Sequence, residues 1–552
     1  MPRRTIETLL IFSLFVVYAG QLPPDVNESH YLTKAKHSWD PLWCPDDIFL
    51  ASSFSHWLFY QLFGWLNQFL SLPQVAWVGR IFTWLLLAFG WQRLSARLLN
   101  TPGLPIVSAA LFLVLNDRFH LAGEWIVGGF EAKGLAYFFV LMALGSLVSR
   151  QFRWLWPYLG LACAFHVLVG GWATIAVLLA FASQYCCRIA ELKVEEEAEG
   201  KVPLALTIKQ NFVFILIGLC LAVVGVLPPL MADLTADPNS KLVASKIYVQ
   251  DRISHHLLFS AFSASRVASF TVLLIVFAMI GRKLQSFEGR HQVGWRRLFG
   301  FAFGSLCISF GGLVLSGVSE QATWLADSSL GLLRFYWFRM ADFAVPCVTA
   351  MALVAWLELL WKRGLFCRTV TIVVGVAIAL MMFWVGIDRH SDSRPRADQA
   401  ALPTYIDDQD RTIETYQNWR RVCEWIKTHT PADAVFITPD QQQTFKWYAH
   451  RTEVVNWKDV PQNASAMVEW SERVSWLIDP QRRLDLGLTE YSDMQLQSLA
   501  TTYGATHLLV PQWQVDLMAD PCDFKQIYPV DSETKATYVV FEFPTAKVKS
   551  DQ

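Results

Sequence analysis

Long runs of apolar residues recur through the first 388 residues of this 552-residue chain, and they constrain its fold more than any other feature. A helix needs about 20 apolar residues to cross the hydrocarbon core of a bilayer. Hydrophobic residues make up 53% of the chain, which is high for a soluble protein. The sequence therefore predicts a polytopic α-helical membrane protein with about eleven transmembrane helices. We expect these at residues 5–22, 74–92, 103–116, 133–149, 154–168, 171–187, 211–231, 266–281, 298–316, 341–361 and 369–387.

Three of these runs are short, at residues 103–116, 154–168 and 171–187, and any of them could be partly re-entrant. The stretch 54–70 is rich in Trp and Phe and is better interpreted as an interfacial or re-entrant helix. The first run follows two arginines and could belong to a signal peptide. We expect an uncleaved first span, because no convincing small-x-small cleavage site stands near residues 19–24.

The loops between the runs differ in charge. If the N-terminus is cytoplasmic, the short loops on that side carry Arg and Lys, near residues 93–97, 150–153, 188–209, 282–297 and 362–368. Such a bias is what the positive-inside rule predicts. The loops 24–50, 116–131, 231–266 and 317–340, and everything after residue 389, then lie on the opposite face.

The character of the chain changes after residue 388. We predict a transmembrane domain over residues 1–388, a polar linker over 389–412 and a soluble α/β domain over 413–552. The periodicity predicts helices at 416–428, 441–449 and 495–503, and strands at 434–438, 452–455, 506–511 and 537–543. No glycine-rich phosphate-binding motif follows a predicted strand, so nucleotide binding is unsupported.

The loop after the first span is unusually rich in ionisable groups, which are costly beside hydrocarbon unless they are hydrated or used. A hydroxyl acceptor needs a nearby carboxylate to take its proton, and Asp25 and Glu28 stand only a few residues beyond the span. Asp40, Asp46 and Asp47 could position an acceptor or bind a divalent cation. The alternative is a hydrated loop whose acids cap helices and turns.

Three further groups carry candidate binding residues. Glu131 and Lys133 stand at the mouth of a span after two glycines, although Lys133 could simply snorkel. Cations that could hold a phosphate occur in the loops 231–266 and 317–340. In the first of these loops they could instead be solvated charges. In the second they could belong to an aromatic belt or to an Arg339–Asp342 pair. These cations are Arg252, His255, His256, Arg334 and Arg339.

Composition excludes some classes of function. The net charge is −1, so no global basic field indicates a nucleic-acid partner. The 10 cysteines are scattered, without the paired spacing of a zinc site.

An acidic pair soon after span one, then a His-Tyr helix and a Trp-Asp-Pro turn, resembles the first outer loop of GT-C membrane glycosyltransferases. The residues are Asp25, Glu28, His30, Tyr31, Lys34, Trp39, Asp40 and Pro41. The C-terminal part is similar to the outer domain of bacterial members. That similarity rests on Trp425-Ile426, Thr430 to Ala434, His450-Arg451, Glu469-Trp470, Arg473 and Tyr503 to Ala505. The likeness is diffuse, covers most of the chain and is strongest to uncharacterised bacterial members.

The resemblance implies a GT-C-like fold in the bacterial inner membrane, with the C-terminal domain in the periplasm. It implies sugar transfer from a polyprenyl-phosphate-linked donor to an unknown acceptor, beside membrane lipid. Glu28 or Asp25 would be the base, although in family members the acids are adjacent and here they are spaced. His30 of the same loop would be a substrate-binding residue. No cofactor is certain, and Mg²⁺ or Mn²⁺ is a candidate. The alternatives are a transporter or lipid flippase, and a non-catalytic scaffold whose outer domain binds a partner.

Overall fold

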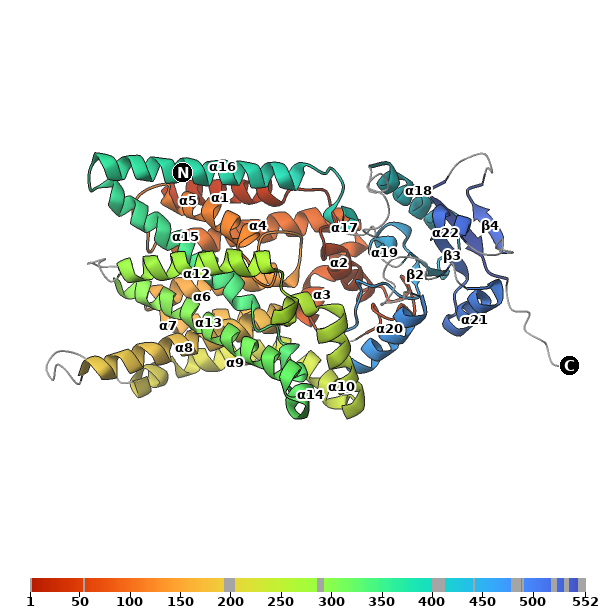
Figure 1. Cartoon of the computed structure of the whole chain (residues 1–552), viewed down its shortest axis with the longest axis horizontal. Helices are drawn as coiled ribbons and strands as arrows, with labels where there is room; N and C mark the ends of the chain where they lie inside the picture. Colours follow the sequence, from red (N-terminus) through yellow and green to blue (C-terminus); the bar gives the residue numbers. More distant parts are fainter. Residues whose placement is uncertain are drawn as a thin grey trace. The chain divides into compact units, whose positions relative to one another are not determined.

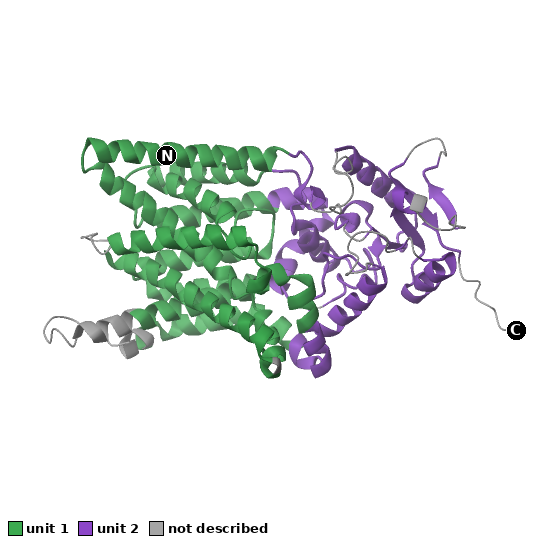
Figure 2. Ribbon diagram, viewed as in Figure 1, with its two compact units in different colours: residues 1–20, 79–231, 245–391 green, residues 21–78, 232–244, 392–552 purple. Residues whose placement is uncertain are grey.

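The computed structural model describes residues 2–52, 55–192, 204–284, 292–399, 413–439, 442–477, 488, 491–517, 524–530 and 536–544. The chain forms two compact units (Figure 2). Unit 1 contains Met1–Gly20, Gly79–Met231 and Ser245–Ser391, and unit 2 contains Gln21–Val78, Ala232–Ala244 and Asp392–Gln552.

Every apolar run predicted as a span is helical, so the prediction of a polytopic helical protein is confirmed. The helices are α1 (Arg3–Ala19), α4 (Leu72–Ser95), α5 (Leu104–Arg118), α6 (Ala132–Val148), α7 (Phe152–Phe165), α8 (Val167–Leu192), α9 (Leu204–Thr235), α12 (Ala264–Leu284), α13 (Gln292–Gln321), α15 (Arg339–Trp361) and α16 (Leu365–His390). Shorter helical elements lie in two of the connections. Between α9 and α12 these include η2 (Ile247–Arg252), α11 (Ser254–Leu257) and η3 (Phe259–Ala261), and between α13 and α15 there is α14 (Thr323–Leu333).

Within the described residues, six helices are long and apolar enough to cross a membrane. They are Leu72–Ser95, Lys209–Thr235, Ala264–Lys283, Gln292–Gln321, Arg339–Trp361 and Leu365–His390. The helices Ala132–Val148 and Val167–Ser183 are apolar but shorter. The total of eleven spans therefore stays a prediction.

Unit 1 is built around α15. About 72% of its apolar window is buried inside the protein, against 11% for α9 and for α16, which leave most of their apolar surface for lipid. Small residues allow close helix crossings elsewhere. A Cβ on Gly160 of α7 would lie 2.2 Å from the backbone oxygen of Gly218 in α9. Any side chain at Gly160 would force these two helices apart.

Contacts at the helix ends fix the relative directions of α1, α5 and α16, which pack against one another (Figure 1). At their C-terminal ends, Arg389 Nη2 donates to Asp117 Oδ1 at 2.8 Å and to the hydroxyl of Tyr18 at 2.6 Å. At the other end of α1, Glu7 accepts hydrogen bonds from Gln92 at 3.0 Å and from the backbone of Gly103 at 3.2 Å. The three helices thus run in one direction, as the predicted alternation of spans requires.

Unit 2 contains a five-stranded sheet in the order β2-β1-β3-β5-β4. The strands are β1 (Val435–Ile437), β2 (Thr452–Glu453), β3 (His507–Pro511), β4 (Lys525–Tyr528) and β5 (Tyr538–Glu542). β1 pairs with β2 and β3 in parallel, and β5 pairs with β3 and β4 antiparallel. The predicted strands all exist, and the predicted C-terminal α/β domain is confirmed. β4 was not predicted.

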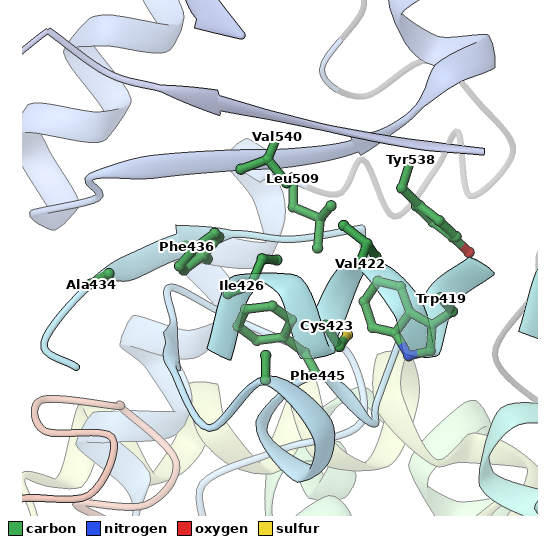
Figure 3. Close-up of a cluster of buried hydrophobic side chains, with 11 residues drawn as sticks. Trp419, Val422, Cys423, Ile426, Ala434, Phe436, Phe445, Leu509, Tyr538 and Val540 are labelled. Atoms are coloured by element: carbon green, nitrogen blue, oxygen red, sulfur yellow. The ribbon is translucent and has the colours of Figure 1, made fainter. Parts of the chain in front are cut away.

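One face of the sheet is covered by α18 (Ile413–His429), which presents Trp419, Val422 and Ile426 to the core as its amphipathic pattern predicts (Figure 3). Phe436 of β1 and Leu509 of β3 complete this core. Further helices are α19 (Phe445–Ala449), α20 (Ala464–Leu477), α21 (Asp493–Tyr503) and α22 (Gln512–Leu517). α20 and α22 were not predicted.

The first outer loop also belongs to unit 2. It forms α2 (Glu28–His37), α3 (Trp57–Phe63) and η1 (Gly64–Gln68), so the helix expected within residues 54–70 is present, although residues 53–54 lie outside the described residues. In the predicted linker, α16 continues to His390 and α17 spans Arg396–Gln399, while residues 400–412 are not described. The domain boundaries 1–388, 389–412 and 413–552 stay a prediction.

Candidate functional site

The two predicted catalytic acids lie side by side at the start of α2. Glu28 is the first residue of this helix, where the partial positive charge of the helix N-terminus favours a carboxylate. Its side chain is fully buried, and Oε2 accepts a hydrogen bond from the backbone N–H of Asp25 at 3.0 Å. The structure therefore brings the two candidate acids, Asp25 and Glu28, together in a buried position.

Asp25 is tied to α17. Its Oδ1 lies 3.4 Å from Nη1 of Arg396, and the backbone N–H of Ala397 donates to the carbonyl of Pro24 at 3.2 Å. The same Oδ1 accepts the N–H of Val26 at 2.7 Å. These contacts fasten the entry to α2 onto a segment almost 400 positions later in the sequence.

The second buried site of unit 2 is centred on Lys446 of α19. Its Nζ lies 2.6 Å from Glu453 Oε1, 2.7 Å from Asp459 Oδ2 and 3.1 Å from Asp47 Oδ2. His30 of α2 joins through Nδ1, which donates to Asp459 Oδ1 at 3.1 Å. We call these five residues the Lys446 centre. It brings together two predicted binding residues, His30 and Asp47.

Burial and charge oppose each other in this centre. Burial alone would lower the pKa of Lys446, but Asp459, Asp47 and Glu453 together raise it well above its usual value. Burial raises the pKa of Glu453 to about 7, although Lys446 opposes this shift. Burial also lowers the pKa of His30. Lys446 is thus held as a cation among carboxylates, and His30 as a neutral ring.

Lys34 packs beside this centre on α2. Its Nζ donates to the carbonyl of Phe49 at 2.7 Å and to the hydroxyl of Ser52 at 2.6 Å. Burial lowers the pKa of Lys34 to about 7, so it does not add a full positive charge at neutral pH.

The remaining acids of the first loop lie elsewhere. Asp40 and Asp46 are exposed, whereas Asp47 is buried and its Oδ2 lies 3.1 Å from Nζ of Lys446. Its Oδ1 accepts the N–H groups of Phe49 at 3.1 Å and Leu50 at 3.0 Å. In the described parts of the chain, no group of three or more His, Cys, Asp and Glu side chains is disposed to hold a metal ion. The predicted divalent cation therefore has no fitting donor set there, because an ammonium fills the place among the carboxylates.

In unit 1, the predicted phosphate-binding Arg339 stands at the start of α15 inside a buried polar cluster. Its Nε lies 3.0 Å from Glu124 Oε2, and Nη1 lies 3.2 Å from Nε2 of His166. The guanidinium also lies 4.0 Å from the centre of the Tyr336 ring. Arg339, Glu124, His166 and Tyr336 form what we call the Arg339 cluster. Since a guanidinium only donates, Nε2 of His166 must be unprotonated in this geometry.

The Arg339–Asp342 pair considered from sequence is not the arrangement in the structure. Asp342 is fully buried and accepts the backbone N–H groups of Leu121 at 2.7 Å and Ala122 at 2.8 Å. A helical spacing of three allowed the pair, but these backbone donors lie nearer. Arg339 instead pairs with Glu124, which lies in the same loop as Leu121 and Ala122.

Glu131 and Lys133, two further predicted binding residues of unit 1, form an ion pair. Lys133 lies 3.3 Å from Glu131 and 3.9 Å from the ring centre of Trp125, and both charged side chains are buried. This buried ion pair differs from the snorkelling alternative, which needs the ammonium in water.

His256 approaches the Arg339 cluster, with its ring 6.4 Å from that of Tyr336 and its Nδ1 hydrogen-bonded to the carbonyl of Ala122. The ring of His255 lies 4.1 Å from that of His256, tilted by 45°, and His255 is exposed. Arg252 and Arg334 are half-buried, Arg252 at the end of η2 and Arg334 beside the ring of Phe335.

Several residues of these sites were missed. Lys446, Glu453 and Arg396 come from segments predicted only as helix, strand and linker, and Asp459 lies between predicted elements. One local signal was available, because Lys446 stands between Phe445 and Trp447 in an apolar helix. A charge placed there needs a buried partner. Asp47 could not be recognised as one of these partners, since it lies hundreds of positions away in the sequence.

Comparisons with known proteins add the following findings. A family described as a domain of unknown function (DUF6798) matches residues 417–477, which run from α18 into α20. No curated protein matches the sequence.

The chain is similar to several solved structures, including the following three. The archaeal oligosaccharyltransferase AglB from Archaeoglobus fulgidus, in complex with an inhibitory peptide and a dolichol-phosphate, is 10% identical over 92% of this chain and 69% of that chain, with a TM-score of 0.44. ArnT from Cupriavidus metallidurans, bound to undecaprenyl phosphate, is 14% identical over 98% and 97%, with a TM-score of 0.38.

A second structure of the Archaeoglobus fulgidus oligosaccharyltransferase, a complex with Zn and sulfate, is 11% identical over 92% and 68% of the two chains, with a TM-score of 0.38. All three TM-scores lie below 0.5, and the identities lie between 10% and 14%.

Proposed function

We propose that this chain is a GT-C-type membrane glycosyltransferase. It would transfer a sugar from a polyprenyl-phosphate-linked donor to an acceptor hydroxyl on the periplasmic face of a bacterial inner membrane. Residues 413–552 would form its periplasmic domain. The observation that carries the proposal is the buried pair of carboxylates, Asp25 and Glu28, at the start of the helix that follows the first apolar helix.

Glu28 is our first candidate for the base, as the fully buried acid with which α2 begins. The Asp25 carboxylate faces the guanidinium of Arg396 at 3.4 Å. A carboxylate that is paired with a cation is stabilised in its charged form and accepts a proton less readily. Asp25 would then position α2 and Glu28, and Glu28 would meet the acceptor.

In the proposed reaction, the acceptor oxygen gives its proton to the Glu28 carboxylate and attacks the anomeric carbon. The bond from that carbon to the phosphate oxygen breaks, and the polyprenyl phosphate leaves with the electron pair. Fixed cations would stabilise the charge on the departing phosphate. Arg339 is our first candidate for this role, with Arg252 and His255 as further candidates. The exposed Asp40 and Asp46 remain candidates for holding the acceptor.

The test uses the purified protein in nanodiscs with a panel of polyprenyl-phosphate-linked sugars, and it measures release of polyprenyl phosphate. Glu28→Gln should lower turnover by about 100-fold or more, since general bases contribute that much. The amide still accepts the N–H of Asp25, so the fold should survive. Asp25→Asn should cost less activity.

Glu424→Gln is the control, because Glu424 is an exposed acid of α18 to which we assign no role, and this change should leave turnover unaltered. A larger loss in Asp25→Asn than in Glu28→Gln would move the base to Asp25. Full activity in both variants would exclude this loop from catalysis and would favour a scaffold or a transporter.

A further inference from the structure

The three carboxylates of the Lys446 centre surround a single buried ammonium. Lys446 is 2% exposed, and Glu453, Asp47 and Asp459 are 1%, 1% and 3% exposed. An ammonium has three N–H donors and no acceptor. Nζ donates a hydrogen bond to Glu453 Oε1 at 2.6 Å and forms ion pairs with Asp459 at 2.7 Å and Asp47 at 3.1 Å, so one ammonium faces all three acids.

Each carboxylate is also held on its second oxygen. Glu453 Oε2 accepts from the hydroxyl of Thr438 at 2.9 Å, and Asp459 Oδ1 accepts from His30 at 3.1 Å. Asp47 Oδ1 accepts two backbone N–H groups of the first loop. One oxygen of each acid is thus fixed by the surrounding protein and the other faces Nζ, which is a preorganised cation site.

The acids come from separate segments. Asp47 lies in the first outer loop, Glu453 in β2 and Asp459 in the loop after it, and His30 connects α2 to the same centre. Without a cation, three buried carboxylates would repel one another and the first loop would lose this attachment to the sheet. A divalent metal ion is the usual protein solution for such an oxygen-rich site.

We propose that Lys446 is a built-in cation that takes the place of a divalent metal ion in this centre and holds the first outer loop on the C-terminal sheet. The carboxylates of this centre would then need no Mg²⁺ or Mn²⁺. For the proposed glycosyl transfer, which this last step assumes, the position of α2 and Glu28 would be set by a side chain and not by a metal.

Two substitutions distinguish the charge of Lys446 from its volume. Lys446→Ala removes the ammonium and leaves space among three carboxylates, so it should create a metal site. Lys446→Met also removes the charge, but its side chain refills the space and should exclude the ion. Mn²⁺ is the probe, because it accepts oxygen ligands and its binding can be followed by electron paramagnetic resonance.

We expect Lys446→Ala to melt at a lower temperature than the wild type and to recover when Mn²⁺ is added. It should bind Mn²⁺ with a Kd of about 1 mM or tighter, the range of weak oxygen-ligand sites. Lys446→Met should melt low and not recover. The wild type should show neither saturable Mn²⁺ binding at this centre nor a change in melting temperature with a chelator.

A wild type that loses stability in the chelator would overturn the proposal, as would equal Mn²⁺ binding by the Ala and Met variants. If neither variant accumulates, a triple variant replaces them, with Lys446→Met, Glu453→Gln and Asp47→Asn together. It removes the excess negative charge and should fold. Continued loss of folded protein would count against the proposal. None of these measurements needs glycosyl transfer. A failure here is therefore separate from a failure of the proposed function.

Discussion

Arg339 and Glu124 form a buried ion pair, with Nε 3.0 Å from Oε2, and only 12% and 6% of the two side chains are exposed. The pair joins the start of α15 to the loop after α5, and His166 binds the same guanidinium from the turn between α7 and α8. Arg339 therefore has a structural role besides the phosphate-binding role that we propose. The two roles can be separated by experiment.

Arg339→Ala should lower both stability and donor binding. It leaves Glu124 buried without its cation, which typically costs about 3–5 kcal/mol of unfolding free energy. Arg339→Lys keeps the charge but not the planar fork that grips phosphate oxygens. We expect it to weaken binding of undecaprenyl phosphate more than it lowers the melting temperature in detergent.

The matched variant combines Arg339→Ala with Glu124→Gln. The second substitution removes the buried carboxylate charge that Arg339→Ala leaves without its cation. We expect its melting temperature to recover most of the loss while undecaprenyl phosphate still binds weakly. Recovery of both properties would mean that Arg339 only balances Glu124 and does not hold the phosphate.

Local patterns were enough to predict the elements of this fold. Apolar runs gave every membrane-helix candidate, and the spacing of Trp419, Val422 and Ile426 gave the buried face of α18. These signals are short-range, because helical and strand periodicity are properties of neighbouring residues. The pairing of the strands and the number of spans needed more than such patterns supply.

The sites were only half predictable. The sequence pointed to Asp25, Glu28, His30 and Arg339 because charged residues next to apolar runs stand out. It could not show that Asp25 faces Arg396 or that Asp47 faces Lys446, since these pairs join segments hundreds of positions apart. It also suggested Asp342 as a partner of Arg339 because helical spacing was the only geometry available.

The direction of the chain in the membrane is a second testable point. The basic loops predict a cytoplasmic N-terminus, and the cluster of Tyr18, Asp117 and Arg389 brings the C-terminal ends of α1, α5 and α16 to one side. A reporter fused after Gln552 should therefore be active only if it works in the periplasm. A fusion after Arg150 should show the opposite behaviour and serves as the control. Activity of a cytoplasmic reporter fused after Gln552 would mean that the predicted number of spans is wrong by an odd number, or that the N-terminus is on the opposite side.

The stability of unit 2 should depend on pH through Asp398 of α17. This carboxyl is 5% exposed and accepts hydrogen bonds from Thr444 at 2.7 Å and Tyr448 at 2.9 Å. Burial raises its pKa to about 6 from the ordinary 3.8, although these hydrogen bonds and two arginines oppose the shift. The folded state therefore holds this proton more tightly than the unfolded state does.

The sign follows from linkage. Between pH 3.8 and about 6 the folded state binds more protons at Asp398, so the free energy of unfolding falls as pH rises through this window. A shift of about two pKa units corresponds to about 3 kcal/mol. Asp398→Asn keeps an acceptor for Thr444 and cannot ionise, so this contribution should disappear from thermal unfolding measured in detergent at a series of pH values. Asp392→Asn is the control. It alters a partly exposed carboxylate that pairs with Arg394 at 2.6 Å, and the fall in unfolding free energy with rising pH should remain. The same fall in Asp398→Asn as in the wild type would assign it to another group.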